Sequence, residues 1–128
     1  MSLVFRTSTV ENHARTVESW IEELNFYETE IGSCELSLGH FIEEMLQQQE
    51  RLAAAERFQN QFIHQREDIN ELKFKVRQYL RALPSGEDKE VDRSLIEYFD
   101  RISEEVDTFR KLFNELLLEF DDFTKEYS

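Results

Sequence analysis

Residues 95–127, LIEYFDRISEEVDTFRKLFNELLLEFDDFTKEY, place an apolar side chain at alternating intervals of four and three residues. This spacing is the heptad pattern of a helix that packs along other helices in coiled-coil fashion. In a chain that is 40% apolar, ten such positions in one register would all be apolar with a chance probability on the order of 10⁻⁴. The pattern therefore predicts a long helix. Its apolar positions are Leu95, Phe99, Ile102, Val106, Phe109, Phe113, Leu116, Phe120, Phe123 and Tyr127.

A reversal of the chain is predicted just before this helix. Pro84 disfavours helical geometry at Leu83, and Ser85 is a typical helix-capping residue with Asp88 three positions further on. We therefore expect the third helix to span about 87–127.

A second apolar stripe predicts a helix over about 35–83. Polar Gln48 and Gln65 interrupt the stripe, where they favour a fixed register or a partly hydrated seam over a catalytic role. Two successive intervals of three residues between Leu52 and Phe62 predict a local overwinding of the coiled coil. The stripe consists of Leu38, Phe41, Met45, Gln48, Leu52, Ala55, Phe58, Phe62, Gln65, Ile69, Leu72, Val76, Tyr79 and Leu83.

The first helix is predicted over about 9–31. Ser8 and Glu11 form a capping box at its start. Gly32 is a natural left-handed cap at its end, and Ser33 can begin the next helix.

A second interpretation joins these two helices into one rod over about 9–83. The seven-residue apolar phase that begins at Val10 continues unchanged through Gly32 and Gly39 to Leu52. A glycine inside a helix costs only about 1 kcal/mol. We expect the break at Gly32 and keep the fused rod as the alternative.

The predicted fold is all-α: an antiparallel, coiled-coil-like bundle of three long helices, up, down and up, in one domain over 1–128. At about 1.5 Å per residue the three helices would measure roughly 33, 72 and 60 Å, so the hairpin of the second and third extends beyond the first. Two helices alone cannot enclose the apolar side chains of that hairpin, and a large exposed apolar patch usually marks an interface. We therefore expect a homodimer that pairs two hairpins. Its interface residues would be Phe58, Phe62, Ile69, Leu72, Val76, Tyr79, Leu95, Phe99, Ile102, Val106 and Phe109.

The charge of the chain limits its partners. A formal net charge of −13 opposes binding to nucleic acid or to an anionic membrane surface, because both need Lys and Arg. It favours a basic protein as the partner.

No apolar run approaches the roughly 20 residues of a membrane span, and the N-terminus lacks the apolar core of a signal peptide. Cys34 is the single cysteine and cannot form a disulfide within the chain. We expect a cytoplasmic protein.

Basic residues gather toward the end of the predicted second helix, and acidic residues dominate the start of the third. We expect ion pairs between these two segments, which would select the antiparallel orientation more than they add stability. The bases are Arg66, Lys73, Lys75, Arg77 and Arg81.

No combination of residues predicts a catalytic or cofactor site. His40 and His64 each precede a carboxylate by three residues, which reverses the Glu-x-x-His order of di-iron bundles. On one helix these two histidines would lie roughly 36 Å apart, so we expect no metal and no cofactor.

The sequence favours a non-enzymatic protein–protein interaction or scaffold protein that self-associates through its helical hairpin. The alternative is a helical bundle that binds a metal, a lipid or a small ligand, with or without enzymatic activity.

Overall fold

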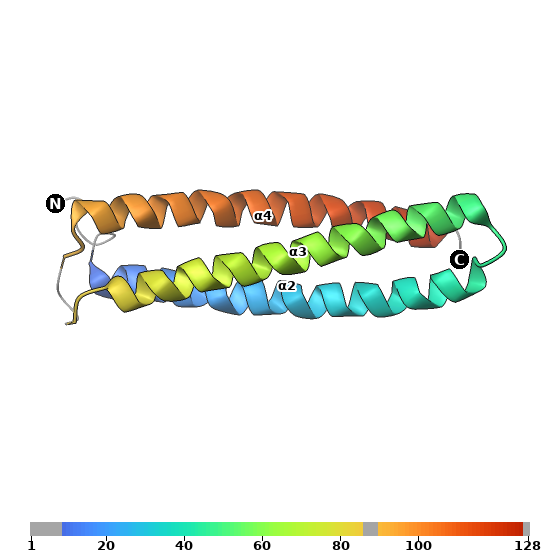
Figure 1. The fold of residues 1–128 in the computed structure, drawn as a ribbon. Helices are drawn as coiled ribbons and strands as arrows, with labels where there is room; N and C mark the ends of the chain where they lie inside the picture. Colours follow the sequence, from blue (N-terminus) through green and yellow to red (C-terminus); the bar gives the residue numbers. More distant parts are fainter. Residues whose placement is uncertain (1–8, 86–89, 127–128) are drawn as a thin grey trace.

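Three long helices lie side by side in the computed structural model, which describes residues 9–85 and 90–126 (Figure 1). They are α2 (Val10–Glu44), α3 (Gln49–Ala82) and α4 (Arg93–Glu126). α3 runs antiparallel to α2, and α4 returns in the direction of α2 (Figure 1). The prediction of an all-α, antiparallel bundle of three long helices is confirmed.

The predicted break at Gly32 is wrong, and so is the alternative of a rod over 9–83. α2 continues through Gly32 and Gly39 and ends at Glu44, and the chain reverses over residues 45–48. The reason is the continuous seven-residue phase, which places an apolar side chain in the core at every heptad of α2. Burial of each such side chain contributes about 1.5–3 kcal/mol, which exceeds the cost of about 1 kcal/mol for an interior glycine.

Because the chain reverses over 45–48, the three helices are nearly equal in length, with 35, 34 and 34 residues in α2, α3 and α4. α2 therefore accompanies the other two helices along the whole bundle (Figure 1). The expected extension of the α3–α4 hairpin beyond the first helix is wrong for the same reason.

Short polar side chains cap the N-terminal ends of α2 and α4. Thr9 Oγ1 accepts a hydrogen bond from the backbone N–H of Asn12 at 3.3 Å, at the start of α2. Before α4, Asp92 Oδ1 accepts from the backbone N–H of Leu95 at 3.0 Å. α4 thus begins later than the predicted position near 87. The predicted cap at Ser85 is wrong, because α4 begins at Arg93 and Asp92 caps it. The predicted cap at Ser8, the partner Asp88 of the predicted capping box and Tyr127 lie outside the described residues.

The core divides into two clusters along the bundle axis. The larger one lies toward the 45–48 reversal, and the smaller one gathers Val17, Trp20, Val76, Tyr79, Ile102 and Val106 toward the other end. α2 approaches α3 along most of its length and comes close to α4 at few positions. Aromatic rings fill the wider α2–α4 seam: the ring centroids of Tyr27 and Phe113 are 4.7 Å apart, and those of Trp20 and Phe99 are 5.0 Å apart.

The two glycines of α2 provide a test of its continuity. A Cβ atom built at Gly32 or Gly39 meets nothing within 4 Å. Gly32→Ala and Gly39→Ala should therefore each raise the free energy of unfolding by about 0.5–1 kcal/mol, because alanine restricts the unfolded chain and favours helix. Urea unfolding followed by circular dichroism measures this change. Ser33→Ala is the control for a helical position without a glycine. A loss of stability in Gly32→Ala would instead indicate a left-handed cap at that residue.

Candidate functional site

The residues predicted to form a dimer interface line the core of a single chain. Eight of the eleven are buried, and the other three, Phe58, Leu95 and Phe99, pack half-buried against the same clusters. The premise that the first helix leaves these side chains uncovered is wrong, because α2 is longer than expected. These residues are therefore not a free surface of the described fold. Self-association itself stays a prediction. The eight buried residues are Phe62, Ile69, Leu72, Val76, Tyr79, Ile102, Val106 and Phe109.

The polar residues singled out in the sequence do not come together. Gln48 lies at the N-terminal cap position of α3 and makes no side-chain capping bond. Gln65 faces the core, where its Oε1 atom is buried and accepts no hydrogen bond within the described structure. His40 and His64 are exposed at separate positions. In residues 9–85 and 90–126, no group of three or more His, Cys, Asp or Glu side chains is placed to hold a metal ion.

Cys34 is half-buried beside a shallow hollow between α2 and α4. Burial raises the pKa of its thiol, and the nearby carboxylates of Glu30 and Glu35 raise it further. A thiol with a raised pKa is a poor nucleophile at neutral pH. We call this depression, of about 700 Å³, the α2–α4 hollow. Its lining residues are Cys34, Ser37, Phe41, Asn114, Leu117, Leu118, Phe120, Asp121 and Thr124.

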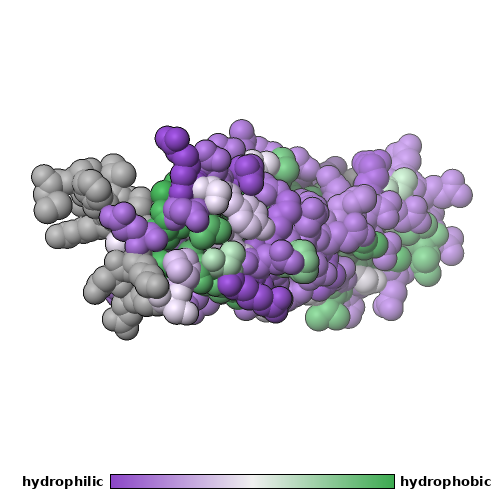
Figure 2. Space-filling model, turned by 60° about the vertical axis from the view of Figure 1, so that its left-hand side comes forward, coloured by the Kyte–Doolittle hydropathy of each residue, from purple (hydrophilic) through white to green (hydrophobic). Residues whose placement is uncertain are grey.

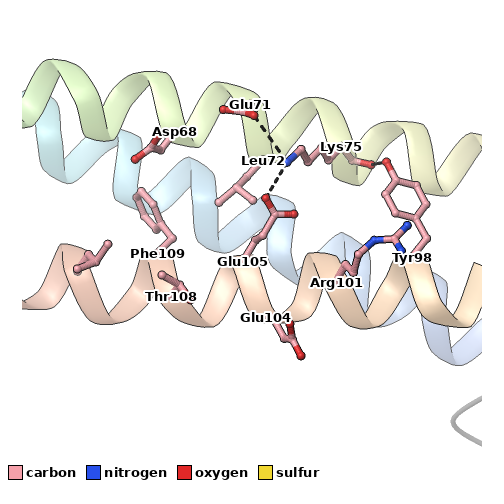
Figure 3. A pocket seen from close by; sticks show the side chains of 11 residues that line it. Asp68, Glu71, Leu72, Lys75, Tyr98, Arg101, Glu104, Glu105, Thr108 and Phe109 are labelled. Atoms are coloured by element: carbon pink, nitrogen blue, oxygen red, sulfur yellow. Dashed lines mark hydrogen bonds and ion pairs between the residues drawn. The ribbon is translucent and has the colours of Figure 1, made fainter.

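A second depression, of about 740 Å³, follows the seam between α3 and α4 (Figure 3). On α4, the side chains of Tyr98, Glu105 and Leu112 are seven residues apart and therefore share one edge of the helix. On α3, Asp68 and Lys75 are also seven residues apart and form the facing edge. We call this depression the α3–α4 groove. Its lining residues are Asp68, Glu71, Leu72, Lys75, Tyr98, Arg101, Glu104, Glu105, Thr108, Phe109 and Leu112.

The floor of the α3–α4 groove is apolar. Leu72 and Phe109 point into the seam from the two helices (Figure 3) and are buried. Leu112 closes one end and leaves 48% of its surface exposed. Tyr98 stands at the other end, half-buried. The exposed apolar surface of the groove therefore lies mainly at its two ends, about four helical turns apart, since 14 residues of helix span about 21 Å. Between them Leu72 and Phe109 are 6% and 4% exposed, and the Lys75–Glu105 ion pair joins the two helices.

The rim of the groove is charged, and both of its cations already contact neighbouring side chains. Lys75 Nζ lies 2.6 Å from a carboxylate oxygen of Glu105 and 3.6 Å from one of Glu71 (Figure 3). The hydrogen bond to Glu105 raises the pKa of Lys75. The guanidinium carbon of Arg101 lies 5.7 Å from the centre of the Tyr98 ring, within the range of a cation–π contact.

The carboxylates of the rim outnumber these cations. Four carboxylates (Asp68, Glu71, Glu104 and Glu105) face two cations, which leaves the lining with a formal charge of −2. Burial raises the pKa of Asp68, and Glu71 and Glu67 add to the rise while His64 opposes it. The negative charge of Asp68 is thus incompletely compensated.

Large apolar side chains also reach the outer surface, as Figure 2 shows for one face, where hydrophobic areas interrupt a mostly hydrophilic surface. Two of them, Leu112 and Leu118, belong to α4 and line the two depressions on either side of it. The exposed large hydrophobic residues are Phe26, Leu36, Leu46, Ile63, Phe74, Leu112 and Leu118.

Ion pairs also join α3 to α2, on the seam that borders neither depression. Lys73 Nζ lies 2.8 Å from a carboxylate oxygen of Glu28 on α2, and Arg66 pairs with Glu35 on the same helix. The predicted pairing of α3 bases with the start of α4 is thus found for Lys75 and Glu105, whereas two other bases pair with α2.

Comparison of the chain with protein-family models, with curated proteins and with solved structures finds no match. In the described part of the chain, no helix has the length and apolar character needed to span a membrane.

Phe62 allows the intrachain core to be distinguished from an interface between chains. Its side chain is 0% exposed, so Phe62→Asp would place a carboxylate in a dry core and remove about 3–5 kcal/mol of packing as well. A typical domain has a stability of only about 5–15 kcal/mol, and we expect this variant to lose most of its helical circular dichroism signal. Leu118→Asp is the control, since Leu118 is 68% exposed and should change stability little. A Phe62→Asp chain that remains fully helical would contradict the described core.

Glu23 allows a test of the α2–α4 register through pH. Its hydrogen bond from Arg110, 2.5 Å from Nε to Oε2, lowers the pKa of Glu23 below its ordinary value of 4.5, against the effect of burial. Because the folded-state pKa is depressed, the stabilisation is complete above pH 4.5 and disappears as the pH falls through the lower folded-state value.

Glu23→Gln should therefore lower the free energy of unfolding by about 1 kcal/mol at neutral pH, as expected for a partly exposed pair. Its stability should also fall less than that of the unmodified chain between about pH 5 and about pH 3. Urea unfolding at several pH values measures both effects. Glu22→Gln, at an exposed neighbouring position, is the matched control and should leave the pH profile unchanged. Identical profiles for the two variants would argue against the Glu23–Arg110 pair.

Proposed function

We propose that this chain is a non-enzymatic protein–protein interaction module whose recognition surface lies along α4. The observation that carries the proposal is that α4 is flanked by two depressions lined in part by apolar side chains, each bordered by an exposed leucine, Leu112 on one side and Leu118 on the other. Contiguous apolar surface bordered by polar residues is typical of protein-binding sites.

The bundle supports such a role because it holds α4 in a fixed position. One face of α4 lies in the core, where Phe113 contacts Tyr27 of α2 and Phe120 contacts Phe62 of α3 at a centroid distance of 5.1 Å. Recognition residues that project from such a helix need little ordering when a partner binds, and a smaller entropic cost favours affinity.

The charge of the chain favours basic partners over acidic ones. A net charge of −13 on 128 residues attracts positively charged proteins over a distance and raises their rate of association. A second copy of the chain carries the same charge, and its approach is opposed. The predicted homodimer is therefore one possible occupant of the α4 surface, and a basic protein is the occupant that the charge favours. Cytoplasmic location stays a prediction from the sequence.

Site-specific photo-crosslinking in the native host tests this proposal. A photoreactive phenylalanine analogue is introduced at position 112, at 118, or at the exposed Thr29 of α2, which lines neither depression. We expect discrete protein adducts from 112 or 118 and none from 29, because a partner covers the surface beside α4. An adduct with the mass of two chains would identify a second copy as that partner.

The proposal would be wrong if positions 112 and 118 gave the same pattern of adducts as position 29. Native mass spectrometry of the freshly purified chain provides a second measurement. A stoichiometric metal ion, lipid or small ligand in that spectrum would favour the alternative function of a ligand-binding bundle.

A further inference from the structure

We propose that the α3–α4 groove binds a basic amphipathic helix of about four turns from another protein. The apolar side chains of that helix would pack on Leu112 and Tyr98 at the two ends of the groove, and its Lys or Arg side chains would pair with Asp68 and Glu104. This inference rests on the proposed function and specifies the chemistry of the partner.

The length and shape of the groove fit a helix. The seam from Tyr98 to Leu112 follows one edge of α4, and an added helix of similar length can lie along it in the manner of a fourth helix in a bundle. The apolar side chains of this strip lie between two charged edges, which the Lys75–Glu105 ion pair joins at one point (Figure 3). Such a strip accepts residues spaced at three and four positions on one face of a helix, with polar residues on either side.

The charges of the groove specify a basic helix. Lys75 is already paired with Glu71 and Glu105, and Arg101 lies over Tyr98. Within the described residues, neither Asp68 nor Glu104 forms an ion pair. A cation beside Asp68 would relieve the repulsion from Glu71 and the cost of burial that raise the pKa of this carboxyl.

The apolar floor makes charge alone insufficient. Leu112 is about half exposed, and the exposed part of its side chain gains about 25 cal/mol for each Å² that a partner covers. A basic but wholly polar peptide would leave this surface in contact with water. The groove therefore requires both an apolar stripe and flanking cations on the same helix.

A synthetic peptide tests the inference on the full chain. The probe is a fluorescein-labelled peptide of about 18 residues with Leu at the heptad a and d positions, Lys and Arg at the flanking positions and Ala or Gln elsewhere. A second peptide carries Glu at the flanking positions, and a third replaces Leu by Gln. Fluorescence anisotropy measures the three dissociation constants at low and physiological salt.

We expect the basic, leucine-bearing peptide to bind at least about tenfold more tightly than either of the other two, with an affinity that falls as salt rises. Asp68→Asn, Glu104→Gln and Leu112→Gln should each weaken its binding about threefold to tenfold. These three side chains reach the surface of the bundle, and circular dichroism establishes that each variant is folded.

Matched controls separate the groove from the overall negative charge. Asp100→Asn removes one charge from an exposed position of α4 outside the groove, and Leu36→Gln removes an exposed leucine of α2 that lines neither depression. Both controls should bind the basic peptide as the unmodified chain does. Equal losses in control and groove variants, equal binding of the acidic peptide, or no binding of any peptide would each overturn the inference.

The outcome is distinguishable from a failure of the proposed function. Partner adducts at position 112 or 118, together with no selective peptide binding, would retain a protein-interaction module and reject the basic helix as its partner. Uniform adduct patterns together with no peptide binding would reject both.

Discussion

The structure depends on the continuous burial of one heptad stripe along α2. Val17, Leu24, Ile31, Leu38 and Met45 stand seven residues apart, and all five are buried against the other two helices. Each contributes about 1.5–3 kcal/mol on burial, so a helix that carries the first four and ends beside the fifth tolerates two interior glycines. A chain that ended its helix at Gly32 would leave the later members of this stripe without a fixed position relative to the earlier ones.

The nearly equal lengths of the three helices follow from this stripe. These lengths in turn determine which side chains are covered and which stay on the surface. Because α2 reaches Glu44, it covers the apolar faces of α3 and α4 along the bundle, and the phenylalanines of α4 become the centre of a single-chain core. The aromatic rings that fill the α2–α4 seam are large, and α2 and α4 approach closely at few positions. The residues at the flanks of the α4 stripe then border depressions, since neither neighbouring helix covers them completely.

The sequence predicts the strongest elements of the fold and misplaces one reversal. The heptad pattern of residues 95–127 identifies the core face of α4, because its side chains from Ile102 to Phe123 at that spacing are buried.

The reversal at 45–48 contains no Gly or Pro, so turn chemistry gives no signal there. The buried stripe of α2 ends at Met45 and that of α3 begins at Ala55, but the seven-residue apolar phase of the sequence runs on to Leu52 and hides the reversal. The change of phase appears only after Leu52. The two successive three-residue intervals between Leu52 and Phe62 reflect this shift. They predicted local overwinding, whereas the structure has a new helix there. The mistaken premise of an uncovered hairpin, from which the dimer interface was predicted, followed from that misplacement. The α3–α4 groove was not predictable from periodicity, because the seam that stays open depends on the sizes of side chains from three helices at the same level.

Ion pairs between the helices determine which charged side chains the surface of the bundle presents to a partner. Several of the bases are used between helices, where Lys73 pairs with Glu28, Arg110 with Glu23 and Lys75 with Glu105. The chain has 28 acidic and 15 basic side chains, and each interhelical pair uses one of each, so the net charge of −13 is unchanged while fewer bases remain on the surface. This excess of acids lowers the tendency of two copies to approach, since like charges repel. The same excess attracts a basic helix, and the apolar floor beside α4 then holds it by contacts that salt does not screen. Repulsion between copies and attraction of a basic partner thus have one physical origin, and together they favour a heterologous partner over a second copy at the α3–α4 groove.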